Sequence, residues 1–557
     1  MSTGVSIAAI ADAYIDELAA LNPMEATFMG VAGHDDRLPD LSPEGVAAEA
    51  DLARRTLASL AAAAPEDDRE RVAAAVMTER LGLQVERYEA GLHHSGLNVV
   101  ASDLQAVRSV FDLMPKTTAE EWEAVAVRMA ALPAALAGLR ATLAEGAGVG
   151  QVPARRQVME CAAQCRRWAG LEEGAGFFAG LAGEAGVLAP SRIAEVGEQA
   201  DHAYAELGDF LRHELAPAAR DHDPVGREAY SLGARVFTGA DLDLEATYAW
   251  GWEELARISA QATATAGAIR PGAALREVAA ALDEEDDRVL VGAEALLSWM
   301  QGLSDTAVAD LAGVHFDIPE PIRTLRCAVS PPGGSSGAYY TGPSEDFTRP
   351  GTMWWSPMPG QERFTTWREV TTVYHEGVPG HHLQVAQVAL NAASLTRYQR
   401  VGCFVSGHGE GWALYAERLM DELGYFADAG ERLGMLDAQA FRAARVVLDI
   451  GAHLELSIPP NALGFHEGEA WSPSLMRELL ATHTLLDEPY IVDEVNRYLG
   501  WPGQAISYKV GEKVWLEARA DAQRRHGASF DLKAFHAAAL DLGPMGLDPL
   551  QAELARI

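Results

Sequence analysis

The segment whose residues could do chemistry is HEGVPGHHLQ, residues 375–384, which follows a stretch with helical character. A His followed directly by Glu, with further His close behind, is how many hydrolases hold a catalytic zinc ion. The imidazole nitrogens bind the metal, and the Glu takes a proton from water. Here His375 and Glu376 would fill these roles. The usual spacing is HExxH, however, and Pro379 occupies the position of the second His.

A regular helix would not bring a second imidazole to the same ion. His381 would lie ~240° around the axis from His375 and ~9 Å along it, and His382 would return to the same face ~10 Å away. Donors that share a zinc ion each lie ~2.1 Å from it. Pro379 has no N–H for the carbonyl of His375, and Gly380 accepts almost any backbone angle. We therefore expect the helix to end or bulge here, which would bring His381 back to the metal.

A third ligand is expected on a later helix, CFVSGHGEGWALYAERLMDELG. In zinc hydrolases of this type it is often a carboxylate, and Glu410 stands at the start of this helix. Glu417 and His408 are alternatives. Gly409 and Gly411 flank Glu410 and allow another segment to approach closely, which favours Glu410 as a site residue over a solvated acidic helix.

Other polar residues are candidates for contacting a substrate. A helix at FRAARVVLDIGAHLEL carries a polar stripe at steps of three and four residues, and such a stripe either contacts a substrate carboxylate or forms structural ion pairs. Tyr498 and Tyr508 could donate a hydrogen bond to the oxyanion of a tetrahedral intermediate. The residues that we assign to substrate binding are Arg445, His453, Tyr340 and His382.

The elements that must position these residues differ along the chain. Residues 1–311 are rich in Ala, Leu, Glu and Arg at helical spacing, broken by Gly146, Gly148 and Gly150, and they predict a helical lobe. From residue 312 the helical period is lost and Pro, Gly, Thr and aromatic residues become frequent, which predicts short strands. We expect residues 312–557 to form a metal-site lobe with a small sheet, the HExxPGH helix and C-terminal helices. An edge strand of that sheet could hold an extended peptide, with Tyr340 beside it.

Composition restricts the partners. The chain has 557 residues, with 44 basic and 80 acidic residues and a net charge of −36, which argues against nucleic acid or an anionic membrane as a partner. Acidic residues near the N-terminus argue against a signal peptide, and we expect no segment that approaches the ~20 apolar residues of a membrane span. We therefore expect a cytoplasmic protein. Its four cysteines do not make a disulfide framework, and its oligomeric state stays open.

Seven blocks along nearly the whole chain carry a family resemblance: NPMEATFMG, VRSVFDLMP, HFDIPEPIRTL, HEGVPGHHLQ, EGWALYAE, RAARVVLDIGAH and PGQAISYKVG. In these the chain resembles the bacterial family known as domain of unknown function 885, which is grouped with zincin-like metallopeptidases. The order of the last four blocks is the specific part of the likeness. The chain departs from the pattern after RAARVVLDIGAH, where LELSIPPNALGFHEGEAWS replaces a KGWT-like segment.

The resemblance implies an elongated, mainly α-helical fold of the zincin (gluzincin) type, with a small β-sheet beside a central cleft. It implies a zinc ion, or another divalent transition metal, held by the HExxPGH block and by the Glu of EGWALYAE. Because the family pattern keeps a His after the Gly, it favours His381 over His382. Carried over to this chain, the metal ligands are His375, His381 and Glu410, the general base is Glu376, and the oxyanion partner is Tyr508.

These features predict a zinc-dependent hydrolase that cleaves a peptide or amide bond of a small molecule or short peptide. Two alternatives remain. Two His and one carboxylate also form the iron site of Fe(II) oxygenases, although such sites normally lie on β-barrels. The chain could instead be a non-catalytic, acidic, helical binding protein with a degenerate metal site, which predicts no stoichiometric metal. Metal analysis separates the three.

Overall fold

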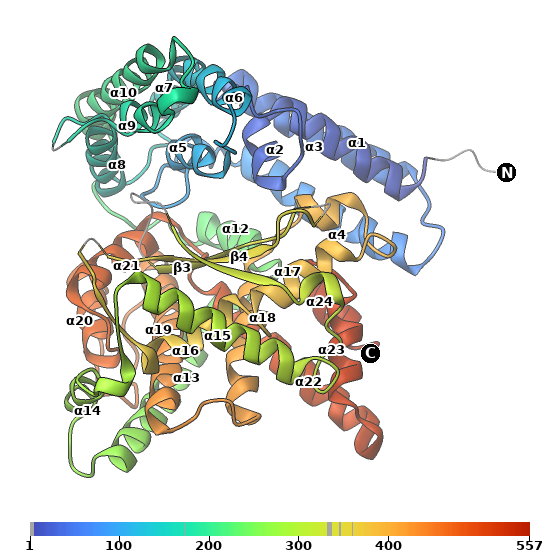
Figure 1. The fold of residues 1–557 in the computed structure, drawn as a ribbon, viewed down its shortest axis with the longest axis vertical. Helices are drawn as coiled ribbons and strands as arrows, with labels where there is room; N and C mark the ends of the chain where they lie inside the picture. The colour runs from blue at the N-terminus through green and yellow to red at the C-terminus, as the bar shows by residue number, and fades with distance from the viewer. Residues whose placement is uncertain (1–4, 173, 331–336, 345–346, 359) are drawn as a thin grey trace. The chain divides into compact units, whose positions relative to one another are not determined.

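The structure is a computed structural model that describes residues 5–172, 174–330, 337–344, 347–358 and 360–557 (Figure 1). The chain forms two compact units. The first contains residues 1–224, 396–402 and 499–501, and the second contains residues 225–395, 403–498 and 502–557. The predicted boundary between residues 311 and 312 does not coincide with this division, because the helices of residues 225–311 pack within the second unit.

The first unit is built from helices. Side chains of Ser6, Asn22, Ser42 and Asp67 accept hydrogen bonds from backbone N–H groups at the starts of four of them, as expected of N-cap residues. The helices are α1 (Ile7–Leu21), α2 (Pro23–Met29), α3 (Pro43–Ala62), α4 (Asp68–Glu89), α5 (Asp103–Leu113), α6 (Ala119–Ala130), α7 (Leu132–Val149), α8 (Arg155–Trp168), α9 (Phe177–Glu184), η1 (Gly186–Leu188), α10 (Ile193–Phe210), the π-helix η2 (Leu211–Leu215), α11 (Ala216–Ala218) and the π-helix η5 (Tyr398–Gly402).

One stretch of the first unit, Ala119–Val149, is long and apolar enough to cross a membrane by length and composition alone. Our expectation that no segment has this length and composition is therefore wrong. The stretch comprises α6 and α7, and Met129, Leu136 and Leu143 on these helices belong to the main hydrophobic core of the unit. The core helix of a folded protein meets the same criterion, so length and composition do not distinguish a core helix from a membrane-spanning helix.

In its described residues the second unit combines helices with five short strands. Its elements are α12 (Arg227–Thr238), α13 (Leu244–Ile269), α14 (Leu275–Leu282), η3 (Asp286–Arg288), β1 (Val289–Val291), α15 (Ala293–Leu311), η4 (Glu320–Ile322), β2 (Leu325–Val329), β3 (Gly337–Thr341), β4 (Gly351–Ser356), β5 (Arg363–Thr365), α16 (Thr366–Glu376), α17 (His381–Leu390), α18 (Ser406–Glu422), α19 (Ala429–His453), α20 (Pro473–His483), α21 (Glu488–Gly500), α22 (Ser507–His526), η6 (Gly527–Ser529), α23 (Leu532–Leu540) and α24 (Leu547–Leu554). The protein is thus mainly α-helical with a small sheet, as predicted.

The strands form two small sheets. In the larger one, β4 lies between β2, to which it is parallel, and β3, to which it is antiparallel. Leu325 pairs with Gly351, and Tyr340 pairs with Met353. The other sheet is the antiparallel pair of β1 and β5. The predicted change from helices to strands after residue 312 is confirmed, and residues 331–336 and 345–346 of that segment lie outside the described part of the chain.

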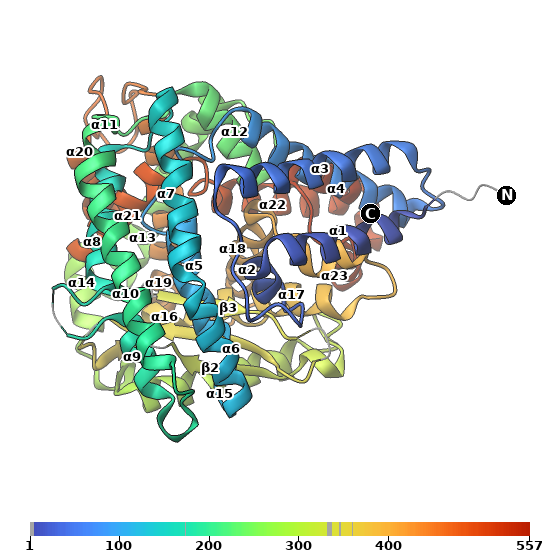
Figure 2. The same cartoon turned by 90° about the horizontal axis from the view of Figure 1, so that it is seen from above.

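A hydrophobic core joins the larger sheet to the helices of the second unit. Met300 of α15, Met353 of β4 and Val373 of α16 belong to one buried cluster, and α15, which packs against β2, runs below the strands β3 and β4 in Figure 1. Helix α13 packs along α19, and α18 packs along α22, which lies beside it in Figure 2. The packing of α13 and α15 explains why residues 225–311 belong to this unit even though their composition resembles that of the first.

Candidate metal centre

The HEGVPGHH segment contains the predicted break in the helix. Helix α16 ends at Glu376, and α17 begins at His381. Between them the chain turns, with the N–H of Gly377 donating to the carbonyl of Val373 and the N–H of Gly380 to that of Tyr374. Because α17 starts a new helix, His381 does not follow the helical geometry set by α16.

The turn is closely packed around its proline and glycine. The Val378–Pro379 peptide bond is cis, and the carbonyl of Pro379 accepts a hydrogen bond of 2.8 Å from the indole N–H of Trp412 on α18. A Cβ atom at Gly380 would lie 1.9 Å from the carbonyl oxygen of His375. The turn therefore requires glycine at this position because of the close approach of backbone, rather than an unusual φ angle.

Three side chains from three helices meet at this turn. Oε2 of Glu410 lies 3.2 Å from Nε2 of His375 and 3.3 Å from Nε2 of His381. The two imidazole rings are perpendicular, with their centroids 4.8 Å apart. Donors that each lie ~2.1 Å from a tetrahedral zinc ion are ~3.4 Å apart, so the contacts of Glu410 have the spacing of ligands around one ion.

The carboxylate of Glu376 lies beside these three side chains. Donor atoms of His375, Glu376 and His381 lie within 4.8 Å of one another, so these three also satisfy a loose criterion for metal binding. Of the two carboxylates, only Glu410 contacts both imidazole nitrogens directly among the described residues. By these contacts Glu410 remains the candidate for the third ligand position. Glu376 is left as a buried carboxylate beside the proposed ligands.

The position of Glu410 depends on close packing between α18 and α22. A Cβ atom at Gly411 would lie 2.4 Å from Cα of Gly511 on α22, and one at Gly511 would lie 1.9 Å from the carbonyl oxygen of Gly407. These glycines let the two helices approach almost backbone to backbone. The predicted close approach at Gly411 is thus a contact between helices, and it fixes the helix that carries Glu410.

Glu417 supports His375 from the other side of the ring. Nδ1 of His375 lies 2.7 Å from Oε1 of Glu417, and the hydroxyl of Thr371 donates to Oε2 of the same carboxylate at 2.7 Å. Outer carboxylates of this kind commonly fix the orientation and tautomer of metal-binding imidazoles. Glu417, our alternative third ligand, therefore lies behind His375. Thr371 is not among the residues predicted from the sequence, although it lies four residues before His375 on the same face of α16.

The other alternative ligand, His408, is held elsewhere. Its Nδ1 accepts a hydrogen bond of 3.1 Å from the backbone N–H of Met545, and burial lowers its pKa to about 4.

The two carboxylates control the charge of His375. Burial disfavours the imidazolium ion, but the hydrogen bonds with Glu410 and Glu417 outweigh it and raise the pKa of His375 to about 10. The pKa of Glu410 is well below its usual value, since the positive charge of His381 and the hydrogen bonds from the imidazoles outweigh burial. Without a metal ion the centre is therefore a charged hydrogen-bonded cluster, and a metal ion would displace the proton on Nε2 of His375.

His382 makes a different set of contacts from His381. Its Nε2 lies 2.9 Å from the carbonyl oxygen of Ile322, and its Nδ1 lies 2.9 Å from the hydroxyl of Tyr340 on β3. A carbonyl only accepts, so Nε2 carries the proton and Nδ1 accepts from the tyrosine. Burial lowers the pKa of His382 to about 4. His382 and Tyr340, both predicted to bind substrate, thus join α17 to the sheet.

Arg445, His453 and Tyr508 lie in a buried polar network around α19 and α21. The guanidinium of Arg445 donates to Glu494 at 3.0 Å and to the hydroxyl of Tyr498 at 3.2 Å, and it lies over the ring of Tyr508. His453 donates from Nε2 to the carbonyl of Tyr498. Their assignment to substrate and oxyanion binding stays a prediction.

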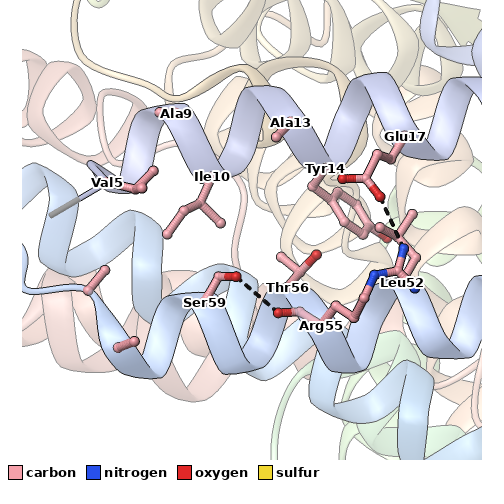
Figure 3. Close-up of a pocket in the computed structure, with 12 residues that line it drawn as sticks. Val5, Ala9, Ile10, Ala13, Tyr14, Glu17, Leu52, Arg55, Thr56 and Ser59 are labelled. Atoms are coloured by element: carbon pink, nitrogen blue, oxygen red, sulfur yellow. Dashed lines mark hydrogen bonds and ion pairs between the residues drawn. The ribbon is translucent and has the colours of Figure 1, made fainter.

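A separate pocket of about 480 Å³ lies in the first unit, between α1 and α3 (Figure 3). Its walls include Ile10, Tyr14 and Leu52, and an ion pair of 3.0 Å between Glu17 and Arg55 lies at its edge. None of the predicted site residues lines this pocket.

Comparison with known proteins places the fold. No curated protein matches the chain. A protein from Colwellia psychrerythraea described as a candidate lipoprotein has a similar crystal structure, with 23% sequence identity, a TM-score of 0.84 and coverage of 99% of both chains. A candidate lipoprotein of unknown function from Shewanella oneidensis has 15% identity and a TM-score of 0.72 over 98% of this chain and 99% of its own. These likenesses show that the fold is shared.

The sequence matches one protein family over almost the whole length of the chain. Residues 23–554 match the family model described as bacterial protein of unknown function (DUF885). The matched segment includes all the residues of the candidate metal centre. The chain is therefore a member of the DUF885 family of bacterial proteins.

Proposed function

We propose that this protein is a zinc-dependent hydrolase, related to the zincin-like metallopeptidases, that cleaves a peptide or amide bond of a small substrate. The observation that carries the proposal is the convergence of His375, His381 and Glu410. One carboxylate oxygen lies 3.2 and 3.3 Å from the two imidazole nitrogens, and the three residues come from three helices that the Pro-Gly turn and the glycine contacts hold in place.

The donor set suits zinc or a similar divalent transition metal. Two imidazoles and one carboxylate are the protein ligands of many catalytic zinc sites, which keep a fourth position open. A zinc ion bound there would act as a Lewis acid on a substrate carbonyl and would lower the pKa of water. The side chains of His381 and Glu410 keep 10% and 16% of their exposure, so the centre is not sealed from solvent.

Glu376 is the proposed general base. It follows His375 directly at the end of α16, and its carboxylate lies close to both imidazoles. Burial raises the pKa of Glu376, while the charges of His381 and His375 oppose this effect. A buried carboxylate with a raised pKa is suited to take a proton from water and to pass it to the leaving amine.

Tyr508 is the proposed hydrogen-bond donor to the substrate oxyanion. Arg497 donates to the phenolic oxygen of Tyr508 at 3.4 Å. Within the described chain the Tyr508 hydroxyl donates no hydrogen bond, so its proton is available to an oxyanion.

Three measurements test the function. We expect protein purified without chelators to contain stoichiometric zinc, and a library of short peptides and N-acyl amino acids to contain substrates that the chelated protein does not cleave. The E376Q variant should keep the metal and lose about 10²- to 10⁴-fold in rate. Full activity of metal-loaded E376Q would exclude Glu376 as the general base. Stoichiometric iron would favour the oxygenase alternative, and absence of any metal would favour a binding protein.

A further inference from the structure

Helices α18 and α22 pack side by side and run in the same direction. Oγ of Ser406 on α18 lies 2.8 Å from Oγ of Ser507 on α22. About one turn further along both helices, a Cβ atom at Gly411 would lie 2.4 Å from Cα of Gly511. The two contacts follow each other in the same order along both helices, so the helices are parallel.

Glu410 and Tyr508 face the same side of this helix pair. Glu410 directly precedes the contact residue Gly411 on α18, and Tyr508 directly follows the contact residue Ser507 on α22. One residue corresponds to a rotation of ~100° about a helix axis. In parallel helices, a backward step on one and a forward step on the other turn to the same side of their interface. The two side chains therefore project to one side, within about one helical turn along the axes.

Arg497 connects the hydroxyl of Tyr508 to the start of α18. Its Nη2 donates to Oε1 of Gln504 at 2.7 Å and to the phenolic oxygen of Tyr508 at 3.4 Å. Nε2 of Gln504 in turn donates to Oγ of Ser406 at 3.4 Å. Ser406 is the first residue of α18 and lies about one turn before Glu410 on the same helix face. A chain of hydrogen bonds thus ties the Tyr508 hydroxyl to the helix that carries the proposed ligand.

The contacts of Arg497 fix both the direction and the charge environment of that hydroxyl. A guanidinium has no acceptor, so the phenolic oxygen accepts from Arg497 and its own proton points elsewhere. The guanidinium of Arg445 lies 4.6 Å from the centre of the Tyr508 ring. Both arginines share one carboxylate, that of Glu494, at 3.0 and 3.3 Å. These three charged groups leave one positive charge over, which favours negative charge that develops beside Tyr508.

We propose that Arg497 is a positioning residue for the oxyanion donor. It holds the phenolic oxygen of Tyr508 so that the O–H points to the oxyanion of the tetrahedral intermediate, and Gln504 keeps Arg497 in place relative to α18. This inference rests on the proposed hydrolase function and deepens it. Because the oxyanion forms only as the bond is cleaved, the loss of Arg497 should lower kcat and leave KM nearly unchanged.

A double-mutant cycle tests the proposal. Y508F removes the donor and should lower kcat by about 10²- to 10³-fold. R497Q should lower kcat by about 10-fold in wild type and cause no further loss in Y508F, because no hydroxyl then remains to be directed. R497K should give an intermediate kcat, since it keeps the charge without the fork that reaches both acceptors. The matched control is R477Q, which changes an exposed arginine on α20 of the same unit and should behave like wild type.

A binding measurement separates this role from a structural one. A phosphonate analogue of the tetrahedral intermediate should bind zinc-loaded R497Q about 10-fold more weakly than wild type, while binding of the amine product stays unchanged. Zinc content and Tm are measured for each variant, and R497K takes the place of R497Q in the cycle if R497Q does not fold. Equal losses of kcat in the wild-type and Y508F backgrounds would overturn the proposal, and so would equal losses for analogue and product.

The outcomes also separate this proposal from the function on which it rests. If wild type shows no metal-dependent cleavage, the hydrolase function fails. Full activity of Y508F would overturn the role of Tyr508 and that of Arg497 with it. A strong loss in Y508F beside a wild-type kcat in R497Q would overturn only the role of Arg497.

Discussion

Replacing Gly380 by alanine is the sharpest test of the turn that forms the centre. The added Cβ would lie 1.9 Å from the carbonyl oxygen of His375 and 2.4 Å from that of Tyr374. Both obstacles are backbone atoms, so no side-chain rotation can relieve the contact. The oxygen and the new carbon must separate by more than ~1 Å, which moves either the end of α16 or the start of α17.

The expected effect falls on metal binding more than on the fold. Overpacking of this kind destabilises by about 1–3 kcal/mol, while a displacement of ~1 Å at a reacting centre lowers activity by about 10²-fold. His381 directly follows Gly380, so its imidazole moves with the turn. We expect G380A to fold, with a lower Tm, and to bind zinc at least about 10-fold more weakly in a competition assay with a chromogenic chelator.

The control is G302A, in the interior of α15, where a Cβ would meet no atom within 4 Å. Alanine is favoured over glycine in a helix by about 1 kcal/mol, so this variant should be at least as stable as wild type and should bind zinc normally. The reasoning is refuted if folded G380A binds zinc and cleaves substrate like wild type, because the two imidazoles would then not depend on the turn.

Three further predictions follow from the site and its surroundings. E417Q should weaken zinc binding by about 10- to 100-fold, since the carboxylate orients His375; unchanged affinity in a chelator competition would exclude this role. Removal of zinc should lower Tm, because at a free zinc concentration of 100 times Kd the bound ion stabilises the protein by about 2.7 kcal/mol; calorimetric scans with and without chelator measure it. Burial raises the pKa of Asp449 to about 7, above the value of ~3.9 for an exposed aspartate. The folded state then binds the extra proton between these values, so this group's contribution to stability falls as pH rises from about 4 to 7, by up to ~4 kcal/mol. D449N should remove this fall, which can be measured as Tm against pH for wild type and D449N. If the difference in Tm between the two proteins stays constant from about pH 4 to pH 7, the prediction is contradicted.

The sequence predicts the break in the HEGVPGHH helix because its cause is local. Pro379 lacks the N–H that a continuing helix needs, and the glycine beside it permits a tight turn. The change from helices to strands after residue 312 is local in the same way. Gly146 and Gly148 do not end their helix, however: α7 continues to Val149 and ends at Gly150, which has a φ angle of 75°. At Gly146 a Cβ would lie 2.6 Å from Cβ of His94, so that glycine serves packing.

The features that escape the sequence depend on contacts between distant residues. The roles of Glu417 behind His375 and of His382 beside Tyr340 follow from the packing of α16, α17, α18 and β3, which no spacing along the chain reveals. The division of the chain into compact units depends on the same kind of contact. Residues 225–311 have the composition of the first unit, but α13 packs along α19 of the second.

Helix α18 has a mechanical consequence. Glu410 contacts both imidazoles, Trp412 donates to the carbonyl of Pro379, and Glu417 holds the far nitrogen of His375. One helix thus contacts the centre at three positions along its length. A shift of α18 along its axis would disturb all three contacts together. Changes in the affinity for a metal ion and changes in the conformation of the turn should therefore occur together.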